Sequence, residues 1–212
     1  MSMKPKLETE LDILEQLESG SVTSQLSLSK RISVSVGFVN ALLNRAIQKG
    51  FVKVSTAPRK RYAYYVTPQG FREKSRLVAE YLETSLQFFR KARAEYRTLF
   101  EEAIPSSAGK YILAGSGELA EIALLAANET GREVDGIFDP AAGSEKLLGL
   151  TVYRELDLLD QTAVLVVTEK SQPQALYEQL RLRFPYNQIL APKFLRVVGN
   201  SLATHDNVDA AE

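Results

Sequence analysis

The sequence predicts an α/β chain with a mostly helical first domain, a long linking helix and a second domain built on a parallel β-sheet. Three observations support this prediction. Apolar residues recur at helical spacing through most of the first hundred residues. One such pattern continues from about residue 68 to about residue 104. After it, strand-like and helix-like apolar segments alternate, which favours parallel strands joined by helices.

Composition limits the chemistry that the chain can perform. It has 212 residues, no cysteine and one histidine, His205, so disulfides, thiolate metal sites and histidine-based catalytic clusters are excluded. No segment approaches the roughly 18 consecutive apolar residues of a membrane helix, and the first residues are too polar for a signal peptide. We therefore expect a cytoplasmic protein that does not associate with membranes.

The formal net charge of zero is unevenly distributed along the chain. Residues 1–104 contain 17 Lys and Arg against 11 Asp and Glu, whereas residues 105–212 contain 9 against 15. Within residues 30–97 there are 15 basic and 4 acidic residues, so a polyanion would be attracted to this segment. A basic but merely solvated surface would have the same charge count.

Three helices are predicted in the first fifty residues. Residues 7–20, LETELDILEQLESG, have four leucines at helical spacing and end at a glycine that can cap the helix. Residues 23–32 form a short second helix. In the third, within residues 33–50, Ser35 is placed as the N-cap and Gly50 ends the helix. Its expected buried stripe is Val39, Leu43, Ala46 and Ile47.

The opposite face of the third helix has the residue types that can enter a major groove. Gly37 and Ala41 are small, and Asn40 and Asn44 carry amides that can bond base edges. Two β-prone runs, residues 51–55 and 62–67, then flank a basic turn and predict a hairpin. The candidate DNA-binding residues are Lys30, Arg31, Ser35, Gly37, Phe38, Asn40, Asn44, Arg45, Arg59, Lys60 and Arg61.

Three helices followed by a basic hairpin resemble the winged helix-turn-helix of MarR-type regulators, and most closely their exopolysaccharide-associated group. The resemblance covers about residues 7–100. It is carried by Val34, Ser35, Gly37, Val39, Asn40, Leu42, Leu43, Ile47, Lys49, Gly50, Val52, Lys53, Val54, Tyr65, Thr67, Pro68 and Gly70. It implies sequence-specific binding of double-stranded DNA by a homodimer, with genes for surface polysaccharide as targets. The alternative is a winged helix used only for protein contacts.

A long helix is predicted over residues 68–104, with Thr67 as cap and Pro68 in the first turn. At 1.5 Å per residue it would span about 55 Å. Its apolar stripe predicts a seam against the same helix of a second copy, and the alternative is packing on its own second domain. The stripe is Val78, Leu82, Leu86, Phe89, Ala92, Tyr96 and Leu99.

The second domain opens on a strand, a glycine turn and a helix. Gly115, Gly117 and Ala120 have G-x-G-x-x-A spacing, and Asp139 follows the next strand, 22 residues after Gly117. Such a turn brings backbone amides to a phosphate at a helix N-terminus, and the acid can bind ribose hydroxyls. The candidate ligand-binding residues are Gly115, Ser116, Gly117, Glu118 and Asp139.

Further alternation predicts five short strands, together with a helix over residues 171–184 capped by Ser171. Residues 110–192 resemble the small Rossmann-like domain of nucleotide-sugar-dependent acyltransferases and of Rex redox repressors. The resemblance is carried by Gly136, Phe138, Asp139, Gly143, Gly149, Leu150, Val152, Tyr153, Leu156, Leu158 and Leu159. It implies a nucleotide-type ligand such as a nucleotide-sugar or NAD(H). Ala120 in the third motif position and the polar end of the chain distinguish it from Rex.

We expect a winged helix-turn-helix at residues 1–67, a dimerisation helix at 68–104, a Rossmann-like domain at 105–192 and a C-terminal segment at 193–212 with a disordered tail. The function expected is a homodimeric transcriptional regulator that senses a nucleotide-type metabolite. A Rex-like NAD(H)-responsive repressor, an enzyme using a nucleotide-sugar or NAD, and a second domain that only assembles are the alternatives. Because no acid and base pair accompanies the glycine turn, we expect no catalysis.

Overall fold

Three hydrophobic clusters organise the described residues, one in the first unit and two in the second. The computed structural model describes residues 6–19, 24–57, 61–102 and 110–199, and the chain divides into units of residues 1–86 and 87–212. Residues 103–109, where the domain boundary is expected, lie outside the described residues. Among the helices that are described, none is both long and apolar enough to cross a bilayer.

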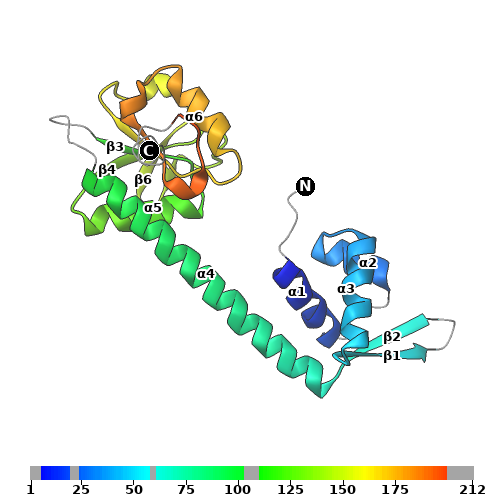
Figure 1. The fold of residues 1–212 in the computed structure, drawn as a ribbon. Helices are drawn as coiled ribbons and strands as arrows, with labels where there is room; N and C mark the ends of the chain where they lie inside the picture. Colours follow the sequence, from blue (N-terminus) through cyan, green and yellow to red (C-terminus); the bar gives the residue numbers. More distant parts are fainter. Residues whose placement is uncertain (1–5, 20–23, 58–60, 103–109, 200–212) are drawn as a thin grey trace, which may run out of the picture. The chain divides into compact units, whose positions relative to one another are not determined.

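The first unit contains the three predicted helices and the hairpin (Figure 1). The elements are α1 (Lys6–Glu18), α2 (Gln25–Ile32), α3 (Val36–Gln48), β1 (Val52–Ala57), β2 (Arg61–Val66) and the beginning of α4 (Pro68–Glu102). The strands β1 and β2 pair antiparallel, so the predicted wing is confirmed. Gly20, the expected end of the first helix, lies outside the described residues.

Side-chain caps and buried leucines explain why these helices form where they do. Ser24 caps α2 in a reciprocal capping box with Ser27, and the Ser35 hydroxyl accepts a hydrogen bond from Phe38 N at 3.3 Å. Val39 and Leu43 of α3 are fully buried, in a core with Ile13, Leu14, Leu17, Leu28, Ile32, Leu42, Val52 and Leu77. The predicted stripe of α3 is therefore confirmed as the core-facing side, although Ala46 and Ile47 are only partly buried.

The second unit is a six-stranded sheet in the order β5-β6-β4-β3-β7-β8. All neighbouring strands are parallel except β5 and β6, which pair antiparallel. The predicted parallel strands are present, but β5 was missed because two residues are too short for an alternating pattern to be visible. The strands are β3 (Tyr111–Ala114), β4 (Val134–Phe138), β5 (Lys146–Leu147), β6 (Leu150–Tyr153), β7 (Val164–Val167) and β8 (Ile189–Leu190).

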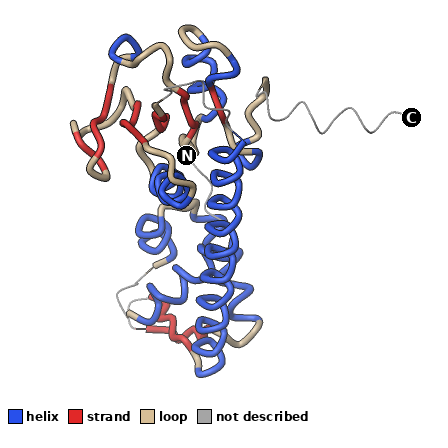
Figure 2. The backbone as a smooth tube through the Cα atoms, turned by 90° about the vertical axis from the view of Figure 1, so that its left-hand side faces the viewer, coloured by secondary structure: helices blue, strands red, loops and turns tan. Residues whose placement is uncertain are grey.

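Helices cover both faces of this sheet (Figures 1 and 2). On one face, α5 (Glu118–Glu129) and the end of α4 share a core with β3. On the other, α6 (Pro173–Arg181) packs through Tyr177 and Leu180. The expected cap Ser171 is wrong. The helix begins at Pro173 because the Glu169 carboxylate accepts hydrogen bonds from the amides of Ser171 and Gln172 and holds them in a turn.

The apolar stripe of α4 has two different partners along its length. Ala92, Tyr96 and Leu99 are buried in the core of the second unit, so their assignment to a seam between two copies is wrong. In the first unit, the buried residue of α4 is Leu77, which is not part of the predicted stripe. Leu82 and Leu86 of the stripe are each 53% exposed. The periodic pattern is continuous even though the helix packs in different cores at its two ends and Leu82 and Leu86 are exposed between them.

Residues just beyond 192 belong to the second unit. The short 3-10 helix Lys193–Leu195 places Phe194 edge-to-face on Phe88 and Tyr96, with ring centroids 5.6 and 5.8 Å apart. The Tyr177 hydroxyl donates to Gly199 O at 2.6 Å. The tail that we expect to be disordered, residues 200–212, lies outside the described residues.

The buried hydroxyl of Tyr96 connects α4 to the sheet, and burial raises its pKa well above the usual range. It donates to Val167 O at 3.0 Å. Tyr96→Phe should lower the unfolding free energy of the second unit by about 1–2 kcal/mol because a buried carbonyl loses its donor. Tyr81→Phe is the control, since Tyr81 lies on the same helix and is 41% exposed. Hydrogen exchange of the β7 amides measures the difference, and equal exchange in both variants would contradict the prediction.

Candidate DNA-reading surface and ligand crevice

The exposed side of α3 presents small and amide side chains. Gly37, Asn40 and Asn44 are exposed, opposite the buried Val39 and Leu43. A Cβ atom at Gly37 would meet nothing within 4 Å, so the backbone there has open space in front of it. Gln48 shares this exposed side and was missed by sequence reasoning, although its helical spacing from Asn44 could have found it. This face has the residue types that can contact base edges in a major groove.

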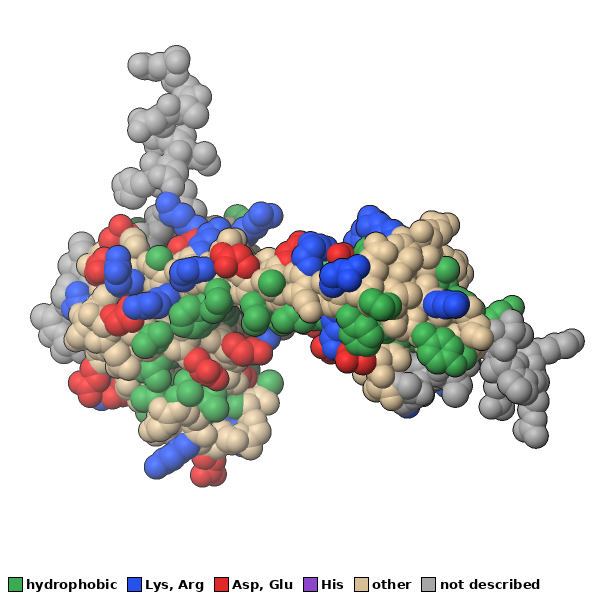
Figure 3. All heavy atoms as spheres, turned by 90° about the horizontal axis from the view of Figure 1, so that it is seen from below, with side chains coloured by type: hydrophobic (Ala, Val, Ile, Leu, Met, Phe, Trp, Pro, Cys, Tyr) green, Lys and Arg blue, Asp and Glu red, His purple; other side chains and the backbone are tan. Residues whose placement is uncertain are grey.

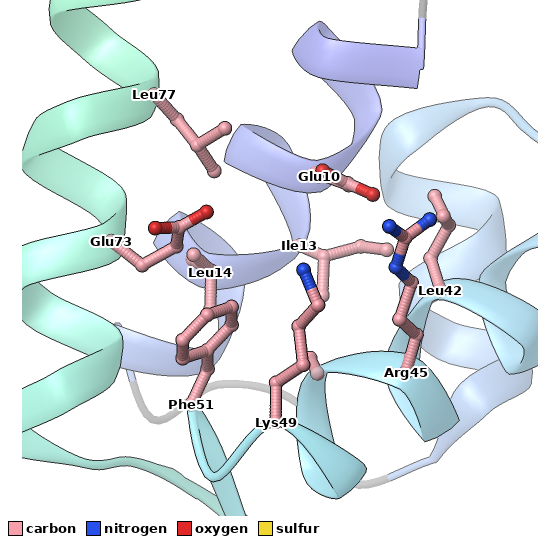
Figure 4. A pocket seen from close by; sticks show the side chains of 10 residues that line it. Glu10, Ile13, Leu14, Leu42, Arg45, Lys49, Phe51, Glu73 and Leu77 are labelled. Carbon is pink, nitrogen blue, oxygen red and sulfur yellow. The ribbon is translucent and has the colours of Figure 1, made fainter.

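Two predicted residues of α3 lie away from the centre of this face. Phe38 packs partly against the core, so much of its ring is not available to DNA. Arg45 lines a small cleft of about 30 Å³ between α1, α3 and α4, together with Lys49 and Glu10 (Figure 4). Its floor is apolar and includes Ile13 and Leu14. Arg45 is therefore at the edge of the reading face rather than on it.

The remaining predicted basic residues belong to α2 and the wing. Lys30 and Arg31 are exposed in the last turn of α2, and Arg31 Nη1 donates to Gln16 Oε1 of α1 at 3.3 Å. Arg59 and Lys60 lie outside the described residues, as does the side chain of Arg61. The described wing also exposes residues that sequence reasoning did not select for DNA contact, namely Lys53, Tyr62 and Tyr65.

A chain of hydrogen bonds links the amides of the reading face. Gln25 Nε2 of α2 donates to Asn40 Oδ1 at 3.1 Å, and Asn44 Nδ2 donates to the same oxygen at 3.1 Å. Gln25 Nε2 also lies 3.5 Å from the hydroxyl oxygen of Tyr64 on β2. Sequence reasoning missed Gln25 because it is 15 residues from Asn40 and no local pattern connects them. These amides are thus held to one another by hydrogen bonds within the first unit.

The second unit opens a crevice where its sheet reverses direction. In chain order, the parallel strands are arranged 3-2-1-4-5, so the reversal falls between β3 and β7. The connection β3–β4 runs through α5 on one face, and the connection β7–β8 runs through α6 on the other. A cleft of about 400 Å³ lies here, lined by Gly115, Phe138, Asp139, Pro140, Ala141, Glu169, Ser171, Gln172, Ala175, Leu176 and Gln179. Ligands of open α/β sheets bind at this position.

The structure brings Ser116 and Asp139 together at the mouth of this crevice. Asp139 Oδ2 accepts hydrogen bonds from Ser116 N at 3.1 Å and from the Ser116 hydroxyl. Asp139 Oδ1 accepts one from Ala141 N at 2.8 Å. The carboxylate therefore ties the loops after β3 and β4 to each other. Because two carboxylate oxygens offer about four acceptor positions, Asp139 retains capacity for one donor from a ligand.

Gly115 and Gly117 have different roles in the turn. Gly115 has φ +117°, and a Cβ there would stand 2.7 Å from Glu169 N, so glycine is needed for the close approach of two backbone segments. Gly117 has φ −84°, and a Cβ there would meet nothing within 4 Å. Gly115 therefore serves the packing of the sheet. Gly117 places no side chain in front of the first turn of α5, where the first amides of a helix lack intrahelical partners.

The loop after β7 supplies polar groups that sequence reasoning missed. The buried hydroxyl of Thr168 donates to Gly115 O at 2.7 Å. Lys170 Nζ lies 2.6 Å from Glu118 Oε2, and this hydrogen bond lowers the pKa of the Glu118 carboxyl. Glu118, a predicted ligand residue, is thus engaged by Lys170 beside the α5 N-terminus. The polar run TEKSQ directly after a buried strand was the available signal.

Comparison with known families identifies the first unit. The family model described as winged helix-turn-helix DNA-binding matches residues 6–53, which span α1, α2, α3 and the start of β1. The chain therefore carries a winged helix-turn-helix DNA-binding domain at its N-terminus, as expected from the sequence. No curated protein matches the chain.

Replacing each of the two glycines by alanine should change the stability of the second unit by different amounts. Gly115→Ala should destabilise the second unit by about 2–4 kcal/mol because it adds both a strained φ and a collision with backbone atoms. Gly117→Ala should change its stability by less than about 0.5 kcal/mol. Thermal unfolding of the two variants and the wild type measures the difference. Equal melting temperatures for the two variants would refute the packing role of Gly115.

Proposed function

We propose that the protein is a homodimeric, sequence-specific transcriptional regulator whose second unit binds a nucleotide-type metabolite and thereby changes DNA affinity. The observation that carries the proposal is the crevice at the switch point of a doubly wound sheet, in a chain that also carries a DNA-binding domain. The resemblance to regulators of surface polysaccharide genes favours a nucleotide-sugar as ligand. NAD(H), as in Rex-type repressors, is the second candidate.

The charges around the crevice suggest how such a ligand would lie. Asp139 and Glu169 line it, and none of the described residues that line it is Lys or Arg. A neutral nucleoside with several donors suits this lining better than a phosphate does. The phosphates would lie at the open Gly117 turn, where the N-terminus of α5 favours negative charge, and Lys170 would exchange its partner Glu118 for a phosphate. Asp139 would accept a ribose hydroxyl with its remaining lone pair.

We propose binding rather than catalysis at this site. Both carboxylates of the crevice hold the backbone, Asp139 through Ser116 and Ala141 and Glu169 through Gln172. The nearest approximation to the Tyr-x-x-x-Lys pair of short-chain reductases is Tyr177 followed by Arg181, and the Tyr177 hydroxyl donates to Gly199 O. Groups held in this way are suited to shaping a site rather than to transferring protons.

The first-unit part of α4 offers a surface for a second copy. Phe71, Leu82 and Leu86 are 44%, 53% and 53% exposed, and with the half-buried Val78 they follow a spacing of seven, four and four residues on one side of the helix. Figure 3 shows one face of the molecule, on which hydrophobic side chains lie at the surface among charged ones. Exposed apolar stripes of this kind favour helix pairing.

Ligand binding should be coupled to DNA binding if the proposal is correct. Adding nucleotide-sugars or NAD(H) to the wild type should raise its melting temperature and change operator affinity by about 5- to 150-fold, the usual range of coupling. Gly117→Val should abolish both effects, because a branched side chain would fill the space in front of the α5 amides. The matched control is Gly143→Val, because Gly143 also has no atoms within 4 Å of a built Cβ but lies far along the chain from the first turn of α5.

Two outcomes would overturn the sensor proposal. One is that no nucleotide-sugar, NAD(H) or coenzyme A changes either the melting temperature or the DNA affinity of the wild type. The other is that Gly117→Val responds to the ligand as Gly143→Val does. Mass spectrometry of small molecules released from denatured protein would identify a ligand that is purified with the chain.

The proposed pairing of α4 helices can be tested separately. Leu82→Lys combined with Leu86→Lys should give a monomer in light scattering and weaken binding to an operator with two half-sites about 10 bp apart. Both side chains are exposed, so the fold should be retained. Thr84→Lys combined with Gln87→Lys adds the same charge on the other side of α4 and should remain a dimer. If the leucine variant also remains a dimer, another surface joins the two copies.

A further inference from the structure

Hydrogen bonds from two neighbouring side chains fix the orientation of the Asn40 amide. Its Oδ1 accepts one hydrogen bond from Gln25 Nε2 and another from Asn44 Nδ2, each at 3.1 Å. A carbonyl oxygen has two lone pairs, so these two donors fill it. Asn40 then presents only the two N–H groups of Nδ2 outward.

This orientation determines which base Asn40 can recognise. Bidentate recognition of adenine requires an amide to donate to N7 and accept from N6 at the same time. Asn40 has no acceptor left for that arrangement. Guanine presents two acceptors, N7 and O6, and is the base that suits a side chain offering donors alone. Asn44 gives one N–H to Asn40 and retains its oxygen and its second N–H, which is the set that adenine requires.

Gln25 is held firmly enough to impose this choice. It is the first residue of α2, directly after the Ser24 cap, and its side chain is half-buried. Its Nε2 lies 3.5 Å from the hydroxyl oxygen of Tyr64, which packs partly against the core of the first unit. A group at position 25 that offered an acceptor instead of a donor would require Asn40 to turn its amide over. Asn40 would then present an oxygen to the groove.

We propose that Gln25 is a specificity-determining residue that positions Asn40 and restricts it to bases offering hydrogen-bond acceptors. Gln25 acts through Asn40 and need not touch a base. The inference rests on the proposed sequence-specific binding of DNA, and it adds which hydrogen-bonding pattern the reading helix presents. It selects guanine at the base pair facing Asn40 and adenine at the base pair facing Asn44.

Selection of binding sites from a random duplex library tests the inference with the full-length protein. Asn40→Ala first identifies the base pair that Asn40 contacts, since preference is lost there alone. The wild type should prefer guanine at this pair by about tenfold or more. Gln25→Glu offers only acceptors and should shift the preference to cytosine or adenine, whose amino groups donate. Glutamate is favourable in a first helical turn, so this variant should fold.

Two further variants separate positioning from charge and from bulk. Gln25→Met keeps the shape but removes the donor, which returns one acceptor to Asn40, so adenine should be tolerated beside guanine. Gln48→Glu places the same charge on the exposed side of α3 away from the amide chain. It should weaken binding to all sequences by repulsion and leave the preference at the Asn40 base pair unchanged.

The outcomes distinguish the inference from the function on which it rests. If the wild type selects a defined sequence and Gln25→Glu keeps guanine at the Asn40 base pair, the positioning role of Gln25 is overturned while sequence-specific binding stands. If the wild type binds duplexes but enriches no sequence, both are overturned. A change of preference in Gln25→Glu that is absent in Gln48→Glu supports the inference.

Discussion

The rest of the structure depends on one helix that must bury apolar side chains in two cores. Leu77 of α4 completes the core of the DNA-binding unit, and Ala92, Tyr96 and Phe100 complete that of the α/β unit. Each unit alone would leave part of its core open without its share of α4. Between these sets, residues 79–88 are exposed on every side of the helix. The helix therefore packs in a core at both ends and is exposed in the middle, where we propose that a second copy packs.

Hydrogen bonds at the crevice hold the turn to which we assign the proposed ligand. Gly115 accepts the Thr168 hydroxyl on its carbonyl and allows no side chain beside Glu169, so it joins β3 to β7. Asp139 joins the same turn to β4 through Ser116. These contacts stabilise the position of Gly117, whose surroundings are empty. A rigid support around an open amide-lined turn is what binding a phosphate without reorganisation requires.

The basic residues and the amides of the DNA-binding unit suit different parts of DNA. Basic residues such as Lys30 and Lys53 are exposed around the reading helix and suit the phosphate backbone, which carries no direct sequence information. The amides of Gln25, Asn40 and Asn44 instead form one hydrogen-bonded group. Such a group responds as a unit, because turning one amide over changes what its neighbours can donate or accept. Specificity would then be a property of the network rather than of single side chains.

Local patterns in the sequence were sufficient for the helices, the hairpin and the five parallel strands, because helix caps, the 3.6-residue period and buried strand runs are short-range signals. The pair Gly115 and Asp139 was also predicted, since its spacing reflects one strand-helix-strand unit. Short-range signals could not assign the partner of the α4 stripe, because Leu82 and Tyr96 repeat identically whether a second copy or the chain's own sheet covers them. They also could not show that Gly115 and Gly117 have different roles, or that Gln25 donates a hydrogen bond to Asn40. Those differences arise from contacts between residues far apart in the chain, and only the folded arrangement brings such residues within hydrogen-bonding or van der Waals distance.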